Sequence, residues 1–194
     1  MANKRTRALE EHEYILIIET IQQGFITAEG KKIKPNPRIA TALTLQANIG
    51  LRIGDIINLK LSNIIRDGGR LRLDMKEKKT NKKREFTVPT EIYTYLQSYA
   101  LENNIRPNQK LFNITVRQVQ KHLQITVEYL GLEGIGTHSF RKFFAVSIYN
   151  NNEYNVELVR QLLQHSSVAV TQHYLSVSPQ IVEEALLKHI KLPT

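Results

Sequence analysis

The hydrophobic pattern of this 194-residue chain changes its period between residues 64 and 89, and this change constrains the fold more than any other feature. On both sides of that stretch apolar residues recur at helical spacing, whereas inside it they alternate with polar ones. An Asp-Gly-Gly turn signal at 67–69 separates an apolar run from an alternating segment at 71–75. A further strand is expected at 85–89. The sequence therefore predicts a mainly α protein with a small three-stranded antiparallel sheet, an α+β fold.

Helices are expected wherever apolar residues recur three or four positions apart. Several of them begin at residues that commonly cap helices, among them Asn36, Thr115 and Thr137. Between the first two helices the chain is polar and basic with three breakers, so a loop is expected at 25–37. The expected helices span residues 10–23, 37–48, 51–64, 90–103, 115–131, 139–150 and 156–164, with an amphipathic tail helix from Pro179.

The charge balance favours a polyanionic partner. Lys and Arg number 27 against 18 Asp and Glu, which gives a formal net charge of +9. Such a surface attracts nucleic acid first and an anionic membrane second. No apolar run approaches the roughly 18 residues of a membrane span, and the N-terminus has no secretory signal. The absence of cysteine excludes disulfides, zinc–thiolate sites and cysteine nucleophiles. We therefore expect a cytoplasmic protein without a membrane partner.

The connection between the second and third expected strands is strongly basic. Residues 76–84 hold six basic side chains and one acidic one. A basic run is most often a solvated loop tip, and that alternative stays open. In a chain this positive, the same hairpin could reach DNA and neutralise its phosphates. The candidate DNA-binding residues are Lys76, Lys78, Lys82, Lys83 and Arg84.

Residues with the chemistry of a phosphodiester site lie in separate short segments. Arg52 stands at the joint between two expected helices, where it could point into a cleft or be an ordinary surface arginine. His138 and Arg141 are three residues apart, on one side of the first turn of a helix whose N-terminus favours an anion. Taken alone, the His-x-x-Arg spacing is common. His165 follows the next helix, and Tyr174 comes nine residues later.

In order and spacing, these motifs resemble the catalytic domain of the tyrosine recombinase, or phage integrase, family. The motifs are Leu51-Arg52-Ile53-Gly54-Asp55-Ile56, the Lys-rich hairpin, Thr137-His138-Ser139-Phe140-Arg141, and Leu163-Gln164-His165-Ser166-Ser167 with Tyr174. The resemblance implies that two arginines hold the scissile phosphate, a hairpin lysine is the general acid, two histidines assist, and a tyrosine is the nucleophile. The residues in these roles are Arg52, Arg141, Lys79, His138, His165 and Tyr174.

Elementary chemistry makes sense of this set. Guanidinium groups match the non-bridging oxygens of a phosphate and stay charged near neutral pH. A phenol has a pKa of about 10 and must lose its proton during attack, for which His138 is the candidate base. The leaving 5′-oxygen needs a proton. The resemblance favours Lys79 as the donor, because Lys79 precedes the hairpin turn as the family's lysine does, with Lys78 and Lys82 as alternatives. A 3′-phosphotyrosine would conserve the energy of the broken bond, so no ATP, metal or other cofactor is expected.

The chain departs from the usual family pattern at three places. Gln164 stands where glycine is common, and Lys142 where histidine is frequent. Only about 40 residues precede the catalytic motifs, so we expect a catalytic domain over 1–194 with no separate N-terminal core-binding domain. Its parts would be an N-terminal helix and basic loop (1–36), a catalytic core (37–178) and a tail helix (179–194). The alternative is a fragment of a longer protein.

The predicted function is site-specific recombination of double-stranded DNA, of the integrase or invertase type. The resemblance implies a tetramer on DNA with exchange of C-terminal helices, formed from monomers. A type IB topoisomerase-like enzyme shares the chemistry, and a non-catalytic DNA-binding relic would share the charge. A metal-dependent nuclease needs clustered carboxylates, yet Glu153 and Glu157 are the only acids between Gly134 and Leu175.

Overall fold

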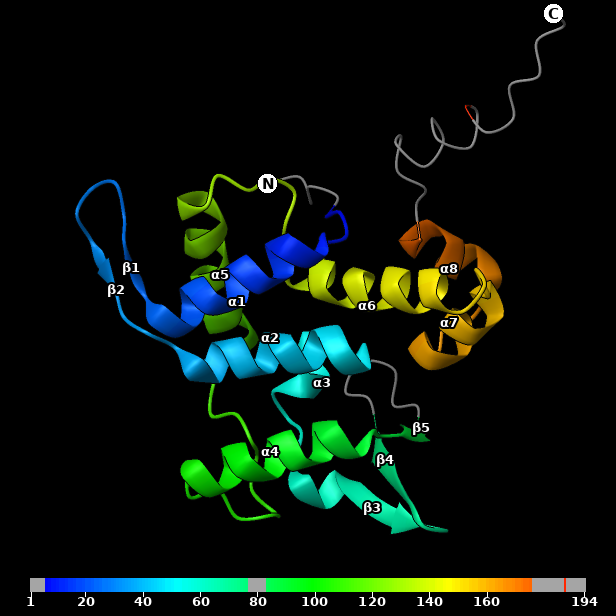
Figure 1. The fold of residues 1–194 in the computed structure, drawn as a ribbon. Coiled ribbons are helices and arrows are strands. Elements are labelled where there is room, and N and C mark those ends of the chain that lie inside the picture. Colours follow the sequence, from blue (N-terminus) through cyan, green and yellow to red (C-terminus); the bar gives the residue numbers. More distant parts are fainter. Residues whose placement is uncertain (1–5, 77–82, 176–186, 188–194) are drawn as a thin grey trace, which may run out of the picture.

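The structure, a computed structural model, describes residues 6–76, 83–175 and 187. Helix α2 (Pro37–Ile49) lies at the centre of this part of the molecule (Figure 1). Helices α1 (Glu11–Gln23) and α6 (Thr137–Asn151) pack against α2, and α5 (Val116–Tyr129) packs against α1. The short helix α3 (Ile53–Ile56) and the helix α4 (Thr90–Glu102), with a three-stranded sheet, lie on the other side of α2 (Figure 1). The remaining described helices are 3-10 helix η1 (Leu61–Asn63), α7 (Val156–Leu163) and α8 (Val168–Tyr174).

The sheet contains β3 (Ile64–Asp67), β4 (Arg70–Lys76) and β5 (Lys83–Thr87), which pair antiparallel in that order. Gly68 and Gly69 form the turn between the first two strands, with φ of 55° and 80°. Two consecutive positive φ values suit a two-residue hairpin turn and favour glycine at both positions. The predicted α+β fold with a small three-stranded sheet is confirmed.

A second, smaller hairpin contradicts the loop that we expected at 25–37. Strands β1 (Phe25–Ile26) and β2 (Lys32–Ile33) pair antiparallel. Phe25 and Ile33 are both buried, and the Phe25 ring stacks on that of Tyr129 in α5, with centroids 4.3 Å apart. The stacking partner lies about a hundred residues away in sequence, so no local pattern could predict this pairing.

Local signals explain where most helices begin and end. The Asn36 side chain accepts a hydrogen bond from the Ile39 N–H at the start of α2, and Gly50 ends that helix with a φ of 63°. The expected helix over 51–64 is wrong, because α3 covers only four residues. There the Asn58 side chain donates to the Gly54 carbonyl (2.7 Å), a side-chain bond that competes with helix continuation.

The beginning of α6 also differs from the expectation. Thr137 is the first residue of the helix and not its cap, which is Gly136. The Gly136 N–H donates to the Ser139 side-chain oxygen (3.1 Å), which satisfies one of the backbone donors near the helix start. The expected tail helix from Pro179 lies outside the described residues, apart from Leu187.

The buried apolar residues form two clusters. The larger cluster unites α1 to α5, the sheet and the first turns of α6. The smaller cluster contains Phe144, Ala145, Val159 and Leu163, and Tyr174 packs against it. The last helices are thus packed against the C-terminal half of α6. In the part of the chain that the structure describes, every helix is too short or too polar to cross a bilayer.

Candidate active site

The side chain of Arg141 connects the segment of Arg52 with the segment of His165. It lies on α6 and is fully buried, with 0% of its surface exposed. Its Nη1 donates to the backbone carbonyl of Gly50 (2.6 Å), and its Nη2 donates to the carbonyl of Leu163 (2.9 Å). Charge-assisted bonds of this kind compensate a buried guanidinium for lost hydration. The joint between α2 and α3 and the end of α7 are therefore both fixed on Arg141.

Arg52 lies at that first joint, two residues after Gly50. Its side chain is half-buried, and its backbone is extended, with φ −69° and ψ 146°. Its carbonyl accepts the N–H groups of Asp55 and Ile56 at the start of α3. This geometry brings the Arg52 segment to Arg141, as a shared arginine site requires.

His165 lies two residues after Leu163, at the other end of the Arg141 bridge. It is buried, with 6% of its surface exposed, and its Nδ1 is 3.1 Å from the side-chain oxygen of Thr171. The backbone carbonyl of His165 accepts a hydrogen bond from Arg160 Nη1 (3.1 Å). Its ring packs on that of Tyr174, with centroids 4.7 Å apart at 58°. The second histidine and the tyrosine are therefore in direct contact.

Arg160 is held in turn by Glu157, one turn earlier on α7. Both guanidinium Nε and Nη2 donate to that carboxylate (2.7 and 2.6 Å). The hydrogen bonds from Arg160 lower the pKa of Glu157 to about 2. This ion pair orients the arginine that bonds the His165 carbonyl.

His138 has a different environment from Arg141, although only three residues separate them. Its side chain is exposed on the first turn of α6. It lines a surface hollow together with Thr6, Gln120 and Gln124. The structure thus brings the segments of Arg52, Arg141, His165 and Tyr174 together, while His138 lines the hollow beside Gln120 and Gln124.

The base of the basic hairpin lies beside the His165 turn. Lys76 ends β4 opposite Lys83 at the start of β5, and Arg84 follows in the same strand. The Lys83 carbonyl accepts a hydrogen bond from Gln164 Nε2 (3.1 Å). The Lys83 ammonium contacts the carboxylates of Glu85 and Asp74, and the Glu85 hydrogen bond raises its pKa. The other hairpin candidates, Lys78, Lys79 and Lys82, lie outside the described residues.

Sequence reasoning missed a charged group that lies beside Tyr174. Lys142 is buried, and its Nζ lies 5.8 Å from the centroid of the Tyr174 ring. The residue had stood out only as a departure from the family pattern, because adjacency to Arg141 says nothing about burial. Among residues 6–76, 83–175 and 187, no group of three His, Asp or Glu side chains is placed to hold a metal ion.

Comparison with known proteins identifies the family. Residues 7–180 match the sequence model of the Phage integrase family. The chain belongs to this family. It is 30% identical over 149 residues to the probable integrase/recombinase YoeC of Bacillus subtilis, covering 71% of this chain and 77% of YoeC. It is also 30% identical over 148 residues to the tyrosine recombinase XerC of Leptospira interrogans, covering 72% of this chain and 46% of XerC.

The fold is also shared with solved structures of recombinases. The crystal structure of the XerH site-specific recombinase, bound to palindromic difH substrate after cleavage, superposes with a TM-score of 0.71 at 22% identity. The match covers 96% of this chain and 53% of XerH, so the chain spans about half the length of XerC and of XerH. The family and fold that the motifs predicted are both confirmed.

Proposed function

We propose that this chain is the catalytic part of a site-specific DNA recombinase, of the integrase or invertase type. It would cut and rejoin DNA strands through a covalent 3′-phosphotyrosine at Tyr174. Membership of the phage integrase family supports the proposal. So do the names of the relatives, which describe integrases and tyrosine recombinases.

One observation carries the assignment to this site. Arg141 donates hydrogen bonds to the backbone carbonyls of Gly50 and Leu163, which stand two residues before Arg52 and His165, respectively. The His165 ring contacts that of Tyr174. The segments that carry Arg52, Arg141 and His165 are thus joined through one guanidinium, and Tyr174 lies against His165. Their chemistry suits a phosphodiester, because arginines neutralise its oxygens and a phenol can attack its phosphorus.

The proposed reaction balances without a cofactor. The Tyr174 oxygen forms a bond to phosphorus, and the bond from phosphorus to the 5′-oxygen breaks. His138 accepts the phenol proton, and the two arginines and His165 stabilise the charge on the phosphoryl oxygens. Because Arg141 is fully buried, a phosphate reaches it only after neighbouring side chains move. The 5′-hydroxyl later reverses the step, so neither ATP nor metal enters the proposal.

A lysine of the basic hairpin supplies the proton to the leaving 5′-oxygen in this proposal. Lys79 is our candidate, and Lys78 and Lys82 are the alternatives. The position of the hairpin base beside the His165 turn supports this role, since Gln164 bonds the Lys83 carbonyl.

The proposed partner is double-stranded DNA, in agreement with the net charge of +9 and with the XerH complex. Monomers would assemble on DNA as a tetramer and exchange the tail helices expected at 179–194. Residues 1–194 would act as a catalytic domain in the cytoplasm. A truncation after Ser178 is expected to abolish strand exchange while leaving the monomer folded, and unchanged recombination would reject helix exchange.

A covalent-adduct assay tests the function. Nicked suicide duplexes, tiled across the DNA that flanks the gene, are incubated with protein in EDTA, and adducts are resolved by denaturing electrophoresis. We expect an adduct with wild type and none with Tyr174→Phe. Cleavage only after metal addition would indicate a nuclease, and binding without adduct would indicate a DNA-binding relic. Relaxation of supercoiled plasmid without strand exchange would indicate the topoisomerase-like alternative, which none of the relatives named above supports.

A further inference from the structure

The environment of Lys142 is unusual for a lysine. Only 8% of its surface is exposed, and lysine is rarely buried unless its charge is paired. Its ammonium donates a hydrogen bond to the backbone carbonyl of Thr6. The same ammonium lies 5.8 Å from the Tyr174 ring centroid, within the range of a cation–π interaction. One buried cation therefore contacts both the N-terminal segment and the proposed nucleophile.

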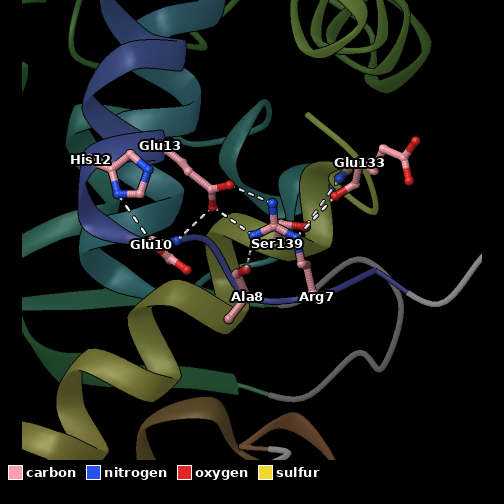
Figure 2. Close-up of polar contacts among 8 residues, drawn as sticks. Arg7, Ala8, Glu10, His12, Glu13, Glu133 and Ser139 are labelled. Carbon is pink, nitrogen blue, oxygen red and sulfur yellow. Dashed lines mark hydrogen bonds and ion pairs between the residues drawn. The ribbon is translucent and has the colours of Figure 1, made fainter. Parts of the chain in front are cut away.

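The Thr6 carbonyl belongs to a segment that is held on two sides. The backbone N–H of Arg7 donates to Gly134 (2.9 Å), and Arg7 Nε donates to the Glu133 carbonyl (3.0 Å), just before α6. The Arg7 guanidinium also donates two hydrogen bonds to the Glu13 carboxylate on α1 (2.7 and 2.5 Å). Figure 2 shows the Arg7 guanidinium lying between these two elements. The carbonyl that binds Lys142 is thus fixed by α1 and by the loop before α6.

Among the described residues, Tyr174 also contacts a ring and apolar groups. Its ring packs on His165 and on the small cluster formed by α6 and α7. The apolar contacts are non-directional, so they leave the ring able to shift along the cluster. A cation beside the ring face adds a directional constraint, because the ring quadrupole attracts the ammonium over its face.

We propose that Lys142 is a positioning residue, which keeps Tyr174 beside His165 and makes that position depend on the docked N-terminal segment. The inference rests on the proposed function, since it takes Tyr174 as the nucleophile. When residues 6–10 are docked, their Thr6 carbonyl fixes the ammonium, and the ammonium fixes the ring. When the segment is displaced, Tyr174 loses this constraint and adduct formation slows. The N-terminal segment thereby controls the rate at which Tyr174 attacks the DNA.

The first test compares Lys142→Met with Lys142→Arg in the full chain. DNA binding is measured by fluorescence anisotropy, and the first-order rate of adduct formation is measured on the suicide duplex at saturating protein. We expect Lys142→Met to bind DNA as wild type does but to form adduct about tenfold or more slowly, because small misplacements of a reacting group are costly. Lys142→Arg keeps the cation and should recover most of the rate. Lys121→Met removes the same charge from the exposed face of α5 and serves as the control.

The second test disturbs the segment without altering Lys142 or Tyr174. Arg7→Gln removes the guanidinium that joins the segment to Glu13, and it should also slow adduct formation. In a double-mutant cycle, Arg7→Gln with Lys142→Met should be no slower than Lys142→Met alone, because both act through one contact. If Lys142→Met does not fold, as judged by circular dichroism, Arg7→Gln decides the question by itself.

The outcomes separate this inference from the proposed function. A wild-type rate in Lys142→Met overturns the positioning role, as does a Lys142→Arg variant as slow as Lys142→Met, whereas a wild-type rate in Arg7→Gln overturns the dependence on the segment. Additive effects in the double mutant overturn the dependence on the segment. An adduct that survives in Tyr174→Phe overturns the proposed function instead.

Discussion

The Nη1 atom of Arg141 lies 2.6 Å from the backbone oxygen of Gly50, a residue 91 positions earlier in the chain. A second bond from the same guanidinium reaches Leu163, and both acceptors precede a motif residue by two positions. The planar fork of arginine can serve two carbonyls in different directions at once. The distance between the Arg52 and His165 segments therefore depends on one buried side chain.

Replacement of Arg141 by lysine should destabilise the protein. An ammonium has no fork and cannot reach both carbonyls, so at least one charge-assisted bond is lost, at a cost of about 1.5–3 kcal/mol. The free energy of unfolding is measured by urea denaturation monitored by circular dichroism. Arg117→Lys, on the exposed face of α5, is the control and should stay within about 0.5 kcal/mol of wild type. An equally small effect at Arg141 would mean that its two bonds add nothing to stability.

Gly50 should tolerate no side chain. Its φ of 63° is costly for other residues, and an added Cβ would lie 2.6 Å from Cε1 of Phe144 on α6. Backbone strain of about 1–2 kcal/mol and overpacking of about 1–3 kcal/mol should together make Gly50→Ala strongly destabilising. Gly30 is the matched control, because its φ is 75° and its Cβ would meet nothing within 4 Å. Thermal unfolding should show a clearly larger loss for Gly50→Ala than for Gly30→Ala, and equal losses would disprove the steric argument.

Most of the fold could be predicted because its signals are local. Helix α2 illustrates this, since Asn36 and Pro37 mark its beginning and Gly50 marks its end. The Gly68-Gly69 pair similarly predicts the turn of the β3–β4 hairpin. The β1–β2 hairpin could not be predicted, because two-residue strands carry almost no pattern and depend on the distant ring of Tyr129.

The sequence indicates the residue types of the candidate site, but it does not indicate which of these side chains are buried or what they contact. Motif order singles out Arg52, Arg141, His165 and Tyr174 as candidates, and their roles stay predictions. Burial of Arg141 and Lys142 depends on how α2, α6 and α7 meet, and no single helix pattern contains that information.

Gln164 offers a direct measurement of backbone strain. It ends α7 in the left-handed region, with φ 51° and ψ 42°, where the family pattern commonly has glycine. Gln164→Gly should relieve about 1–2 kcal/mol of strain and lose one partly exposed hydrogen bond to the Lys83 carbonyl, worth about 0.5–1 kcal/mol. We therefore expect a net gain in the free energy of unfolding of about 0.5 kcal/mol, read from urea denaturation. Gln164→Ala is the control, since it loses the bond and keeps the strain. If Gln164→Gly proves no more stable than Gln164→Ala, strain at this position is negligible.

The ion pair between Arg7 and Glu13 should make stability depend on acid pH. Hydrogen bonds from Arg7 hold the pKa of the buried Glu13 carboxyl below its usual value. Since the folded pKa is lower than the unfolded one of about 4.3, the stabilisation is present above that pH and is lost as the pH falls through the folded pKa.

Wild-type protein should therefore lose unfolding free energy more steeply than Glu13→Gln between about pH 5 and pH 3, because only the carboxylate takes up a proton there. Urea titrations at a series of pH values give the two slopes. Arg7→Gln is the companion variant, and it should flatten the wild-type slope as Glu13→Gln does, because it removes the cause of the lowered pKa. Parallel slopes in all three proteins would show that the contact does not change the protonation of Glu13 on folding.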